Sequence, residues 1–235
     1  MWSYYGAKTN VIDLYPPPKF DKVIEPFAGT ARYALKYFEK DVLIVDKYDV
    51  VIDIWKWLQK CSKRDILSLP NMKKGEHVDD YTFDCLEAKH LMGFMIGFMT
   101  ETPRKTATIR MEQRPNSIKY TLNRIANNLH KIRHWEIRSG SYEDIENENA
   151  SWFIDPPYVK GGDRYKYSNK HIDFSQLADW CKSRKGQAIV CETLGADWLD
   201  FKRMTTHHTR RGPQHEVIWS NLPTAFDIEQ PSLFD

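Results

Sequence analysis

The stretch Ser151–Tyr158, which has the sequence SWFIDPPY, is the segment on which the predicted fold of this chain depends most. Its apolar run Trp152–Ile154 is typical of a short buried strand. The prolines Pro156 and Pro157 lack amide donors and fix φ near about −65°, so the strand must end at Asp155 in a stiff turn. Open α/β sheets bind their ligands at the carboxyl ends of parallel strands, and we therefore expect a site at this turn.

The chemistry of this turn suits methylation of an exocyclic amine on a nucleic-acid base. Such a nitrogen is a poor nucleophile because its lone pair is delocalised into the ring. The Asp155 carboxylate and the Pro156 carbonyl could accept its two N–H bonds and favour a tetrahedral nitrogen. Tyr158 could stack on the base, a contact worth roughly 1–3 kcal/mol. A Pro-Pro turn closed by a surface tyrosine is the alternative, and these residues alone leave it open.

The same stretch resembles the Asp-Pro-Pro-Tyr motif of S-adenosylmethionine-dependent amino-methyltransferases, which act on adenine N6 or cytosine N4 in DNA, with relatives acting on RNA. The order of motifs resembles that of the Dam-type DNA adenine methyltransferases over about residues 1–60 and 119–221. The resemblance implies a Rossmann-like class I methyltransferase fold in a compact, phage-like member. It comprises a mostly parallel sheet, a C-terminal antiparallel hairpin and a short helical, basic insertion. The implied catalytic residues are Asp155, Pro156, Pro157 and Tyr158.

Three earlier segments carry the resemblance to the cofactor site. Tyr4–Lys8 resembles the family's Trp-x-Gly-Gly-Lys opening, which implies that Lys8 lies near the cofactor carboxylate or the target base. Glu25–Ala31 follows an apolar strand and resembles a Glu-Pro-Phe-x-Gly-x-Gly loop, and we expect Thr30 to cap a helix over residues 31–38. Asp46 ends a second strand, 17 residues after Gly29, where a carboxylate can accept ribose hydroxyls; a helix N-cap is its alternative role.

A later segment, around Tyr142 and Asp144, borders the adenine of the cofactor in this family. The resemblance thus implies S-adenosylmethionine as cofactor. The expected cofactor-binding residues are Tyr4, Gly6, Lys8, Glu25, Pro26, Phe27, Ala28, Gly29, Thr30, Asp46, Tyr142, Asp144 and Asp155.

The βα alternation breaks after Cys61, so we expect two parts of one catalytic domain, residues 1–61 and 117–225, around an insertion at 62–116. Within residues 101–125, six side chains are basic and two are acidic. The resemblance places target recognition here, and the alternative is a solvated basic loop. The expected DNA-binding residues are Arg104, Lys105, Arg110 and Arg114 in the insertion, Lys160, Arg164, Tyr165 and Lys166 after the catalytic turn, and Arg210 and Arg211 near the end.

The C-terminal tail, residues 226–235, contains Gln230–Phe234, which resembles the peptide by which bacterial DNA enzymes bind the replication sliding clamp. A flexible tail could offer Leu233 and Phe234 to a hydrophobic pocket. DNA and this clamp are therefore the expected partners. The neighbouring pair His207 and His208 lacks an evident third ligand, and we expect no metal.

Composition excludes several other classes of protein. With 41% hydrophobic and 28% charged residues, the 235-residue chain is typical of a globular α/β domain. Its net charge of +2 does not by itself predict a nucleic-acid partner. The chain contains no apolar run of about 18 residues, no leader-like apolar segment and no zinc-type cysteine spacing. We expect free thiols, no membrane partner and a cytoplasmic location in a bacterial or phage-infected cell.

Other elements are predicted from periodicity: helices over residues 50–61, 81–99, 119–132 and 174–185, strands over 42–46, 135–138 and 188–191, and a hairpin from 201–204 and 217–219. Alternative functions stay open. They are methylation of cytosine N4, of RNA or of a protein glutamine, and a methyltransferase fold retained only for binding nucleic acid. Glutamine-directed relatives usually carry Asn in place of Asp155, which disfavours that target.

Overall fold

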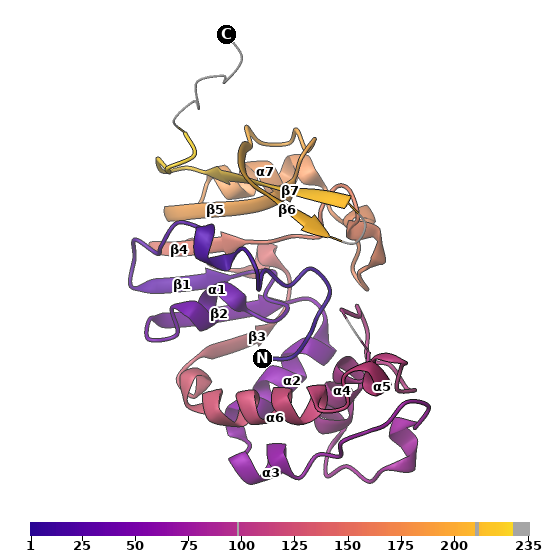
Figure 1. Cartoon of the computed structure of the whole chain (residues 1–235). Helices are drawn as coiled ribbons and strands as arrows, with labels where there is room; N and C mark the ends of the chain where they lie inside the picture. The colour runs from indigo at the N-terminus through magenta and orange to yellow at the C-terminus, as the bar shows by residue number, and fades with distance from the viewer. Residues whose placement is uncertain (98, 210–211, 228–235) are drawn as a thin grey trace.

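Five parallel strands and an antiparallel hairpin form one sheet in the computed structural model of this chain, which describes residues 1–97, 99–209 and 212–227 (Figure 1). The strands are β1 (Lys22–Glu25), β2 (Asp41–Asp46), β3 (Glu136–Ser139), β4 (Ala150–Ile154), β5 (Gly186–Thr193), β6 (Lys202–Thr209) and β7 (Gly212–Ser220). The helices are α1 (Arg32–Lys36), α2 (Asp49–Lys60), α3 (Lys63–Leu67), α4 (Leu86–Met95), α5 (Arg110–Gln113), α6 (Ser117–Asn128) and α7 (Phe174–Lys182). Six 3-10 turns are η1 (Ile12–Leu14), η2 (Val78–Asp80), η3 (Leu129–Ile132), η4 (Tyr142–Asp144), η5 (Gly162–Arg164) and η6 (Asn169–His171).

The strand order is β3-β2-β1-β4-β5-β7-β6. Strands β3, β2, β1, β4 and β5 pair in parallel, whereas β7 is antiparallel to both β5 and β6. The order of the parallel strands reverses between β1 and β4, and ligands of open α/β sheets bind at such a reversal, outside the carboxyl ends of the strands. Asp155 follows β4 at this edge of the sheet. The expected α/β class, with a mostly parallel sheet and a C-terminal antiparallel hairpin, is confirmed.

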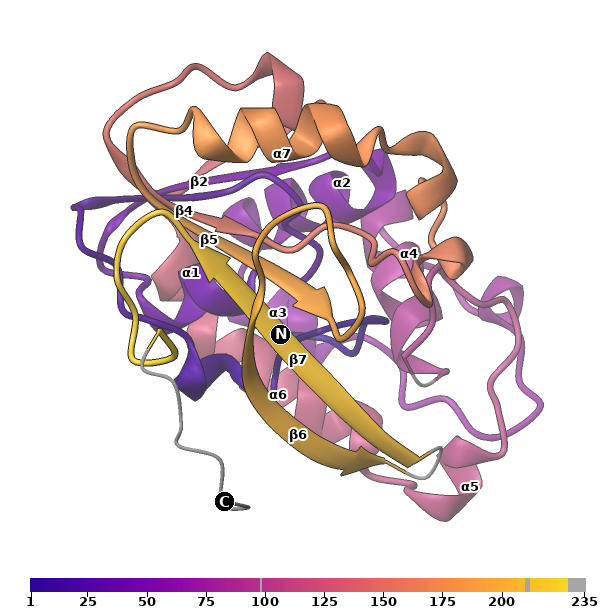
Figure 2. The same cartoon turned by 90° about the horizontal axis from the view of Figure 1, so that it is seen from above.

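Two apolar clusters cover the two faces of the sheet, as alternation along buried strands requires. On one face Ile24, Leu43 and Trp152 pack with residues of α7. On the other face Val23 and Ile44 pack with residues of α1, α2, α4 and α6. Figure 2 shows α7 and α1 on opposite sides of the strands.

The insertion shares the core of the second face. Met72, Val78, Leu91 and Phe94 all belong to the cluster that contains Val23 and Ile44 on β1 and β2. Helices α2 to α6 gather beside the β3 edge, away from the hairpin (Figure 1). Residues 62–116 are therefore packed on the sheet domain and not separated from it.

The helix expected over residues 81–99 is wrong in its bounds, because α4 spans only Leu86–Met95. Tyr81 has extended backbone after η2, and its hydroxyl donates to Glu76, 2.5 Å away, so the chain does not continue helically. Leu86, the first residue of α4, is 61% exposed. Phe98 lies outside the described residues.

The remaining elements occur where the sequence predicts them, with altered ends. The helix over 50–61 is α2, that over 119–132 is α6 followed by η3, and that over 174–185 is α7, which ends at Lys182. The hairpin strands are longer than expected, because β6 and β7 extend by pairing with one another beyond the apolar residues. Within the described ranges, every helix is too short or too polar to cross a bilayer.

Candidate active site

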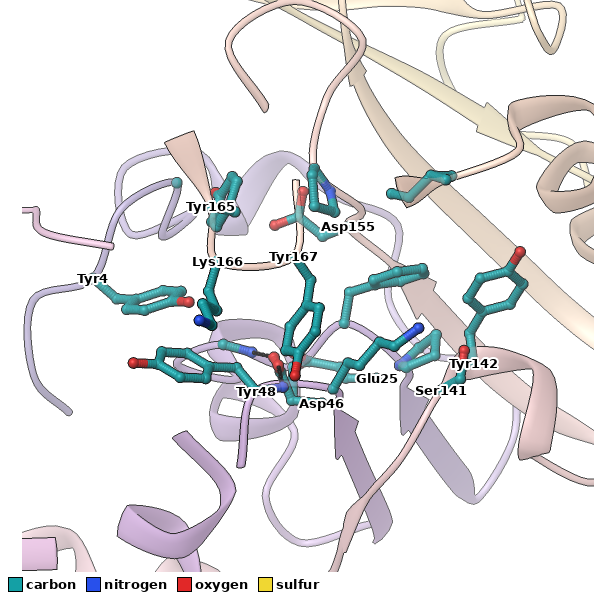
Figure 3. Close-up of a pocket in the computed structure, with 18 of the residues that line it drawn as sticks. Tyr4, Glu25, Asp46, Tyr48, Ser141, Tyr142, Asp155, Tyr165, Lys166 and Tyr167 are labelled. Atoms are coloured by element: carbon teal, nitrogen blue, oxygen red, sulfur yellow. Dashed lines mark hydrogen bonds between the residues drawn. The ribbon is translucent and has the colours of Figure 1, made fainter. Parts of the chain in front are cut away.

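A pocket opens at the carboxyl ends of the strands, at the reversal between β1 and β4 (Figure 3). Its empty volume is about 1090 Å³, part of it open to solvent, which is enough for a nucleoside-sized ligand. Five segments of the chain supply its walls: the N-terminal segment, the loop after β1, the end of β2, the end of β3, and the chain at and after the end of β4. Of the expected site residues, it is lined by Tyr4, Gly6, Lys8, Glu25, Pro26, Phe27, Ala28, Gly29, Thr30, Asp46, Tyr142, Asp155, Pro157, Tyr165 and Lys166.

The loop after β1 is held in a conformation that leaves room above it. Gly29 has φ +47°, and a Cβ there would stand 3.3 Å from the ring of Tyr4. Ala31 also has positive φ, +44°, at the position where the family pattern has Gly. A left-handed conformation costs a non-glycine residue about 1–2 kcal/mol, so this loop is strained at Ala31.

The expected N-cap role of Thr30 is wrong. The N-cap position of α1 is Ala31, and no side chain of its own caps the helix. Instead Glu25, at the end of β1, accepts a hydrogen bond from the amide of Ala34. Burial raises the pKa of Glu25 to about 8, against the smaller effect of this hydrogen bond. The buried hydroxyl of Thr30 has no hydrogen-bond partner among the described residues and lines the pocket.

Asp46 closes the base of the pocket (Figure 3). Its two carboxylate oxygens accept hydrogen bonds from the amides of Gly29 and Tyr48, each at 2.8 Å. Burial raises the pKa of Asp46, and the two amides oppose that rise. Tyr48, not Asp46, is the N-cap residue of α2. The carboxylate therefore ties the glycine loop to the end of β2 and keeps further lone pairs for a ligand.

Lys8 and Asp155 form a buried ion pair at the opposite end of the pocket. The Lys8 Nζ lies 2.8 Å from each Asp155 carboxylate oxygen, and the side chains are 7% and 20% exposed. Burial raises the pKa of Asp155, although the charge of Lys8 opposes this. Burial is the largest single effect and disfavours the ammonium of Lys8, but the charges of Asp155, Glu216 and Cys191 and the hydrogen bond to Asp155 together outweigh it and hold the pKa of Lys8 above its ordinary value.

Tyr158 is held beside this ion pair. Its hydroxyl donates to Glu216 on β7 at 2.8 Å, and the Lys8 Nζ lies 4.7 Å from the centre of its ring. The hydroxyl of Tyr15 donates to the same oxygen of Glu216 at 3.4 Å. Tyr158 and the buried Pro156 are not among the residues that line the pocket, whereas Asp155 and Pro157 are.

The far end of the pocket has aromatic walls. The rings of Phe27 and Tyr142 lie 5.3 Å apart at 31° to one another. Asp144, expected to border the same space, points elsewhere: its carboxylate accepts from the amide of Ser141 at 3.0 Å and caps η4. Ser141 and Glu143 line the pocket from this segment instead.

The segment after the Asp155–Tyr158 turn is bonded to the N-terminal segment. The Tyr165 hydroxyl donates to the carbonyl of Tyr5, and the Tyr5 hydroxyl donates to the carbonyl of Gly161, both at 3.2 Å. Gly6, with φ +73°, lies so close to Tyr165 that a Cβ would overlap its hydroxyl. Arg164 forms an ion pair with Glu101 at 3.0 Å. The loop after the turn is thus attached to the rest of the chain at several points.

The expected DNA-binding residues do not form one surface with the pocket. Tyr165 and Lys166 line it, and Lys160 is exposed nearby. Arg104 and Lys105 line a second, neighbouring cavity that shares Tyr48 with the first. Arg110 is half-buried and Arg114 is exposed, both on or next to α5. Arg210, Arg211 and the clamp-like segment Gln230–Phe234 lie outside the described residues.

Sequence reasoning missed two acidic residues close to Asp155. They are Glu192, which is fully buried at the end of β5, and Glu216 on β7. An acid that ends a buried apolar run, as Glu192 does after Ala188–Cys191, was the available signal. Glu216 sits in a hairpin without a motif, and only the pairing of β7 with β5 brings it to the site.

Comparison with known proteins gives no family: no protein-family model matches the chain, and no curated protein matches it significantly.

Proposed function

We propose that this protein is an S-adenosylmethionine-dependent methyltransferase that acts on adenine N6 of a DNA base turned out of its duplex. One observation carries the proposal. The buried carboxylate of Asp155, in an Asp-Pro-Pro-Tyr turn, opens into the same pocket as the glycine loop at Gly29 and the carboxylate of Asp46. An acceptor for an amine and a cradle for a nucleoside therefore open into one pocket, as a transfer between their two ligands requires.

The pocket fits the proposed cofactor on several counts. The loop at Gly29 leaves space that a side chain would fill, the Thr30 hydroxyl lacks a partner among the described residues, and Asp46 keeps free lone pairs. The aromatic pair Phe27 and Tyr142 could hold an adenine ring. When bound, S-adenosylmethionine would supply an electrophilic methyl group on a sulfonium centre.

The residues around Asp155 have defined tasks in this proposal. The Asp155 carboxylate and the Pro156 carbonyl accept the two N–H bonds of the target amine and orient its lone pair. The Pro156 carbonyl accepts no hydrogen bond from the described residues, although Pro156 is buried and is not among the residues that line the pocket. Lys8 opposes the rise in the pKa of Asp155 that burial causes and so favours the ionised carboxylate, which is the form that acts as an acceptor.

Tyr158 differs from the simple expectation that it stacks on the base. The ammonium of Lys8 already lies over its ring, and its hydroxyl is tied to Glu216. In the proposed enzyme Tyr158 therefore first holds Lys8 against Asp155. It can meet a base only if Lys8 moves from its ring.

The test is methyl transfer to unmethylated duplex DNA, read by mass spectrometry of the released nucleosides. Wild-type protein is expected to produce N6-methyladenine, and Asp155→Ala is expected to produce none while still binding S-adenosylmethionine. Asp144→Ala, a change on the same edge of the sheet but facing away from the pocket, is the matched control and should retain activity.

Other outcomes have definite meanings. N4-methylcytosine would keep the mechanism and change the base, and methylation only of RNA would change the substrate. Near-normal activity of Asp155→Ala would refute the mechanism. Cofactor binding without methyl transfer to any nucleic acid would refute the proposed enzymatic activity. It would support the alternative of a methyltransferase fold retained only for binding nucleic acid.

A further inference from the structure

The turn after β4 lacks the means by which a strand end is usually held. Pro156 and Pro157 have no amide hydrogen, so they cannot bond to β5 or β1. The first amides that can donate belong to Tyr158 and Val159. The position of the Pro156 carbonyl, one of the two proposed acceptors, therefore depends on what holds these following residues.

Glu192 holds one of them. Its carboxylate accepts a hydrogen bond from the Val159 amide at 2.7 Å, from its own neighbour's amide at Thr193 at 2.6 Å, and from the Trp198 indole at 3.4 Å. Asn169 completes the attachment by donating to the carbonyls of Tyr158 and Val159, at 3.0 and 2.8 Å. Just beyond the two prolines, hydrogen bonds therefore hold both a backbone amide and two backbone carbonyls.

The chemistry of Glu192 is unusual for a core residue. Its side chain is fully buried and burial raises its pKa, while N–H donors, not a cation, oppose that rise. Burying a carboxylate in this way costs free energy that an apolar residue would not. A carboxylate suits the position because it only accepts: the amide of a glutamine would bring a donor against one of the three N–H groups.

We propose that Glu192 is a positioning residue for methyl transfer, which fixes the Asp155–Pro157 turn through the amide of Val159. This inference rests on the proposed function, because it assigns Glu192 a task in orienting the amine acceptors. Glu192 does not line the pocket. It lies on β5 next to the turn and binds the chain just beyond the two acceptors, whereas the pairing of β4 with β5 ends before them, at Ile154.

Two substitutions of Glu192 separate the effect of side-chain length from the effect of charge. Glu192→Asp keeps the charge but is one methylene shorter, so it loses the Val159 amide. Glu192→Gln keeps one oxygen for Val159 and loses an acceptor for Thr193. Gln187→Ala is the matched control, because Gln187 is a buried polar residue of the same strand that holds Lys19 and Pro17, at the end away from the pocket.

Two readouts are needed, and the first does not require catalysis. Hydrogen exchange of the Val159 amide should be at least about 10-fold faster in Glu192→Asp than in the wild type, with Glu192→Gln in between and Gln187→Ala unchanged. For the second, kcat should fall about 100-fold in Glu192→Asp, the usual scale for a misplacement of about 1 Å, with KM for S-adenosylmethionine within about 2-fold. Gln187→Ala should keep the wild-type kcat even if its melting temperature falls as much as that of Glu192→Asp.

The outcomes separate this inference from the proposed function. A wild-type protein that methylates no nucleic acid overturns the proposed function and with it the catalytic task of Glu192, whatever the exchange data show. A wild-type protein that methylates DNA, together with a Glu192→Asp variant of normal kcat or normal Val159 protection, overturns this inference alone. If Glu192→Asp fails to fold, the Glu192→Gln variant decides instead. A Glu192→Gln variant with the kcat and the Val159 amide protection of the wild type would overturn this inference alone.

Discussion

The ion pair of Lys8 and Asp155 should be worth little by itself and should be costly to break on one side. Taking both charges out of water offsets much of their attraction, whereas removing one partner leaves the other buried and unpaired. Asp155→Asn leaves the ammonium of Lys8 without its carboxylate partner, on a side chain that is only 7% exposed. We therefore expect a loss of about 3 kcal/mol in the free energy of unfolding. Lys8→Met should cost less, about 2 kcal/mol, because a carboxyl that is 20% exposed can take up a proton.

The double variant should recover most of this loss and remain within about 1 kcal/mol of the wild type, because it leaves no unpaired charge. Urea unfolding followed by circular dichroism at pH 7.5 gives the four free energies of the cycle. The same double variant should show no methyl transfer, since the acceptor carboxylate is gone. A double variant destabilised by the sum of the single losses would refute this account of the pair.

Three further predictions concern the walls of the pocket. In the native state Glu25 has a pKa of about 8, so it keeps a proton that the same group loses near pH 4.5 in the unfolded chain. The contribution of Glu25 to stability is therefore complete below about pH 4.5 and is lost as pH rises to 8. Glu25→Gln should therefore flatten the fall in urea midpoint between pH 5 and 8.5, and an unchanged slope would contradict this. Gly29→Ala should destabilise the protein by about 1–2 kcal/mol and weaken S-adenosylmethionine binding in calorimetry, whereas Gly75→Ala, with positive φ but open space, should cost only stability. Gly6→Ala should raise KM for S-adenosylmethionine by separating the two fastened segments, and adding Tyr165→Phe should restore it in part; no rescue would mean that backbone strain alone is responsible.

Much of the fold follows from sequence because its signals are local. The apolar runs at β1, β2, β4 and β5 and the spacing along α2 predict those elements within a few residues. The ends of α4 could not be found in this way, since apolar residues continue on both sides of it. The helix begins only after η2 and the extended Tyr81, and at its other end the carbonyls of Gly93 and Ile96 accept hydrogen bonds from the amides of Arg104 and Thr108.

The pocket is harder to predict because its electrostatics arise from residues far apart in sequence. Asp155, Gly29 and Asp46 carry motifs and could be named. The carboxylate of Glu216 reaches the site only through the pairing of β7 with β5, and no spacing rule links it to Tyr158. The capping of α1 by Glu25 in place of Thr30 depends likewise on a left-handed residue that the sequence does not reveal.

The placement of β7 between β5 and β6 has a consequence for biosynthesis. Lys8 meets Asp155, whose neighbour Tyr158 is tied to Glu216, so the ring of contacts joins positions separated by more than two hundred residues of chain. A chain emerging from the ribosome cannot complete this arrangement until its last long strand has been released, and contacts of such sequence separation form slowly. The nascent protein would therefore lack the complete set of contacts among Lys8, Asp155, Tyr158 and Glu216 until β7 has paired with β5.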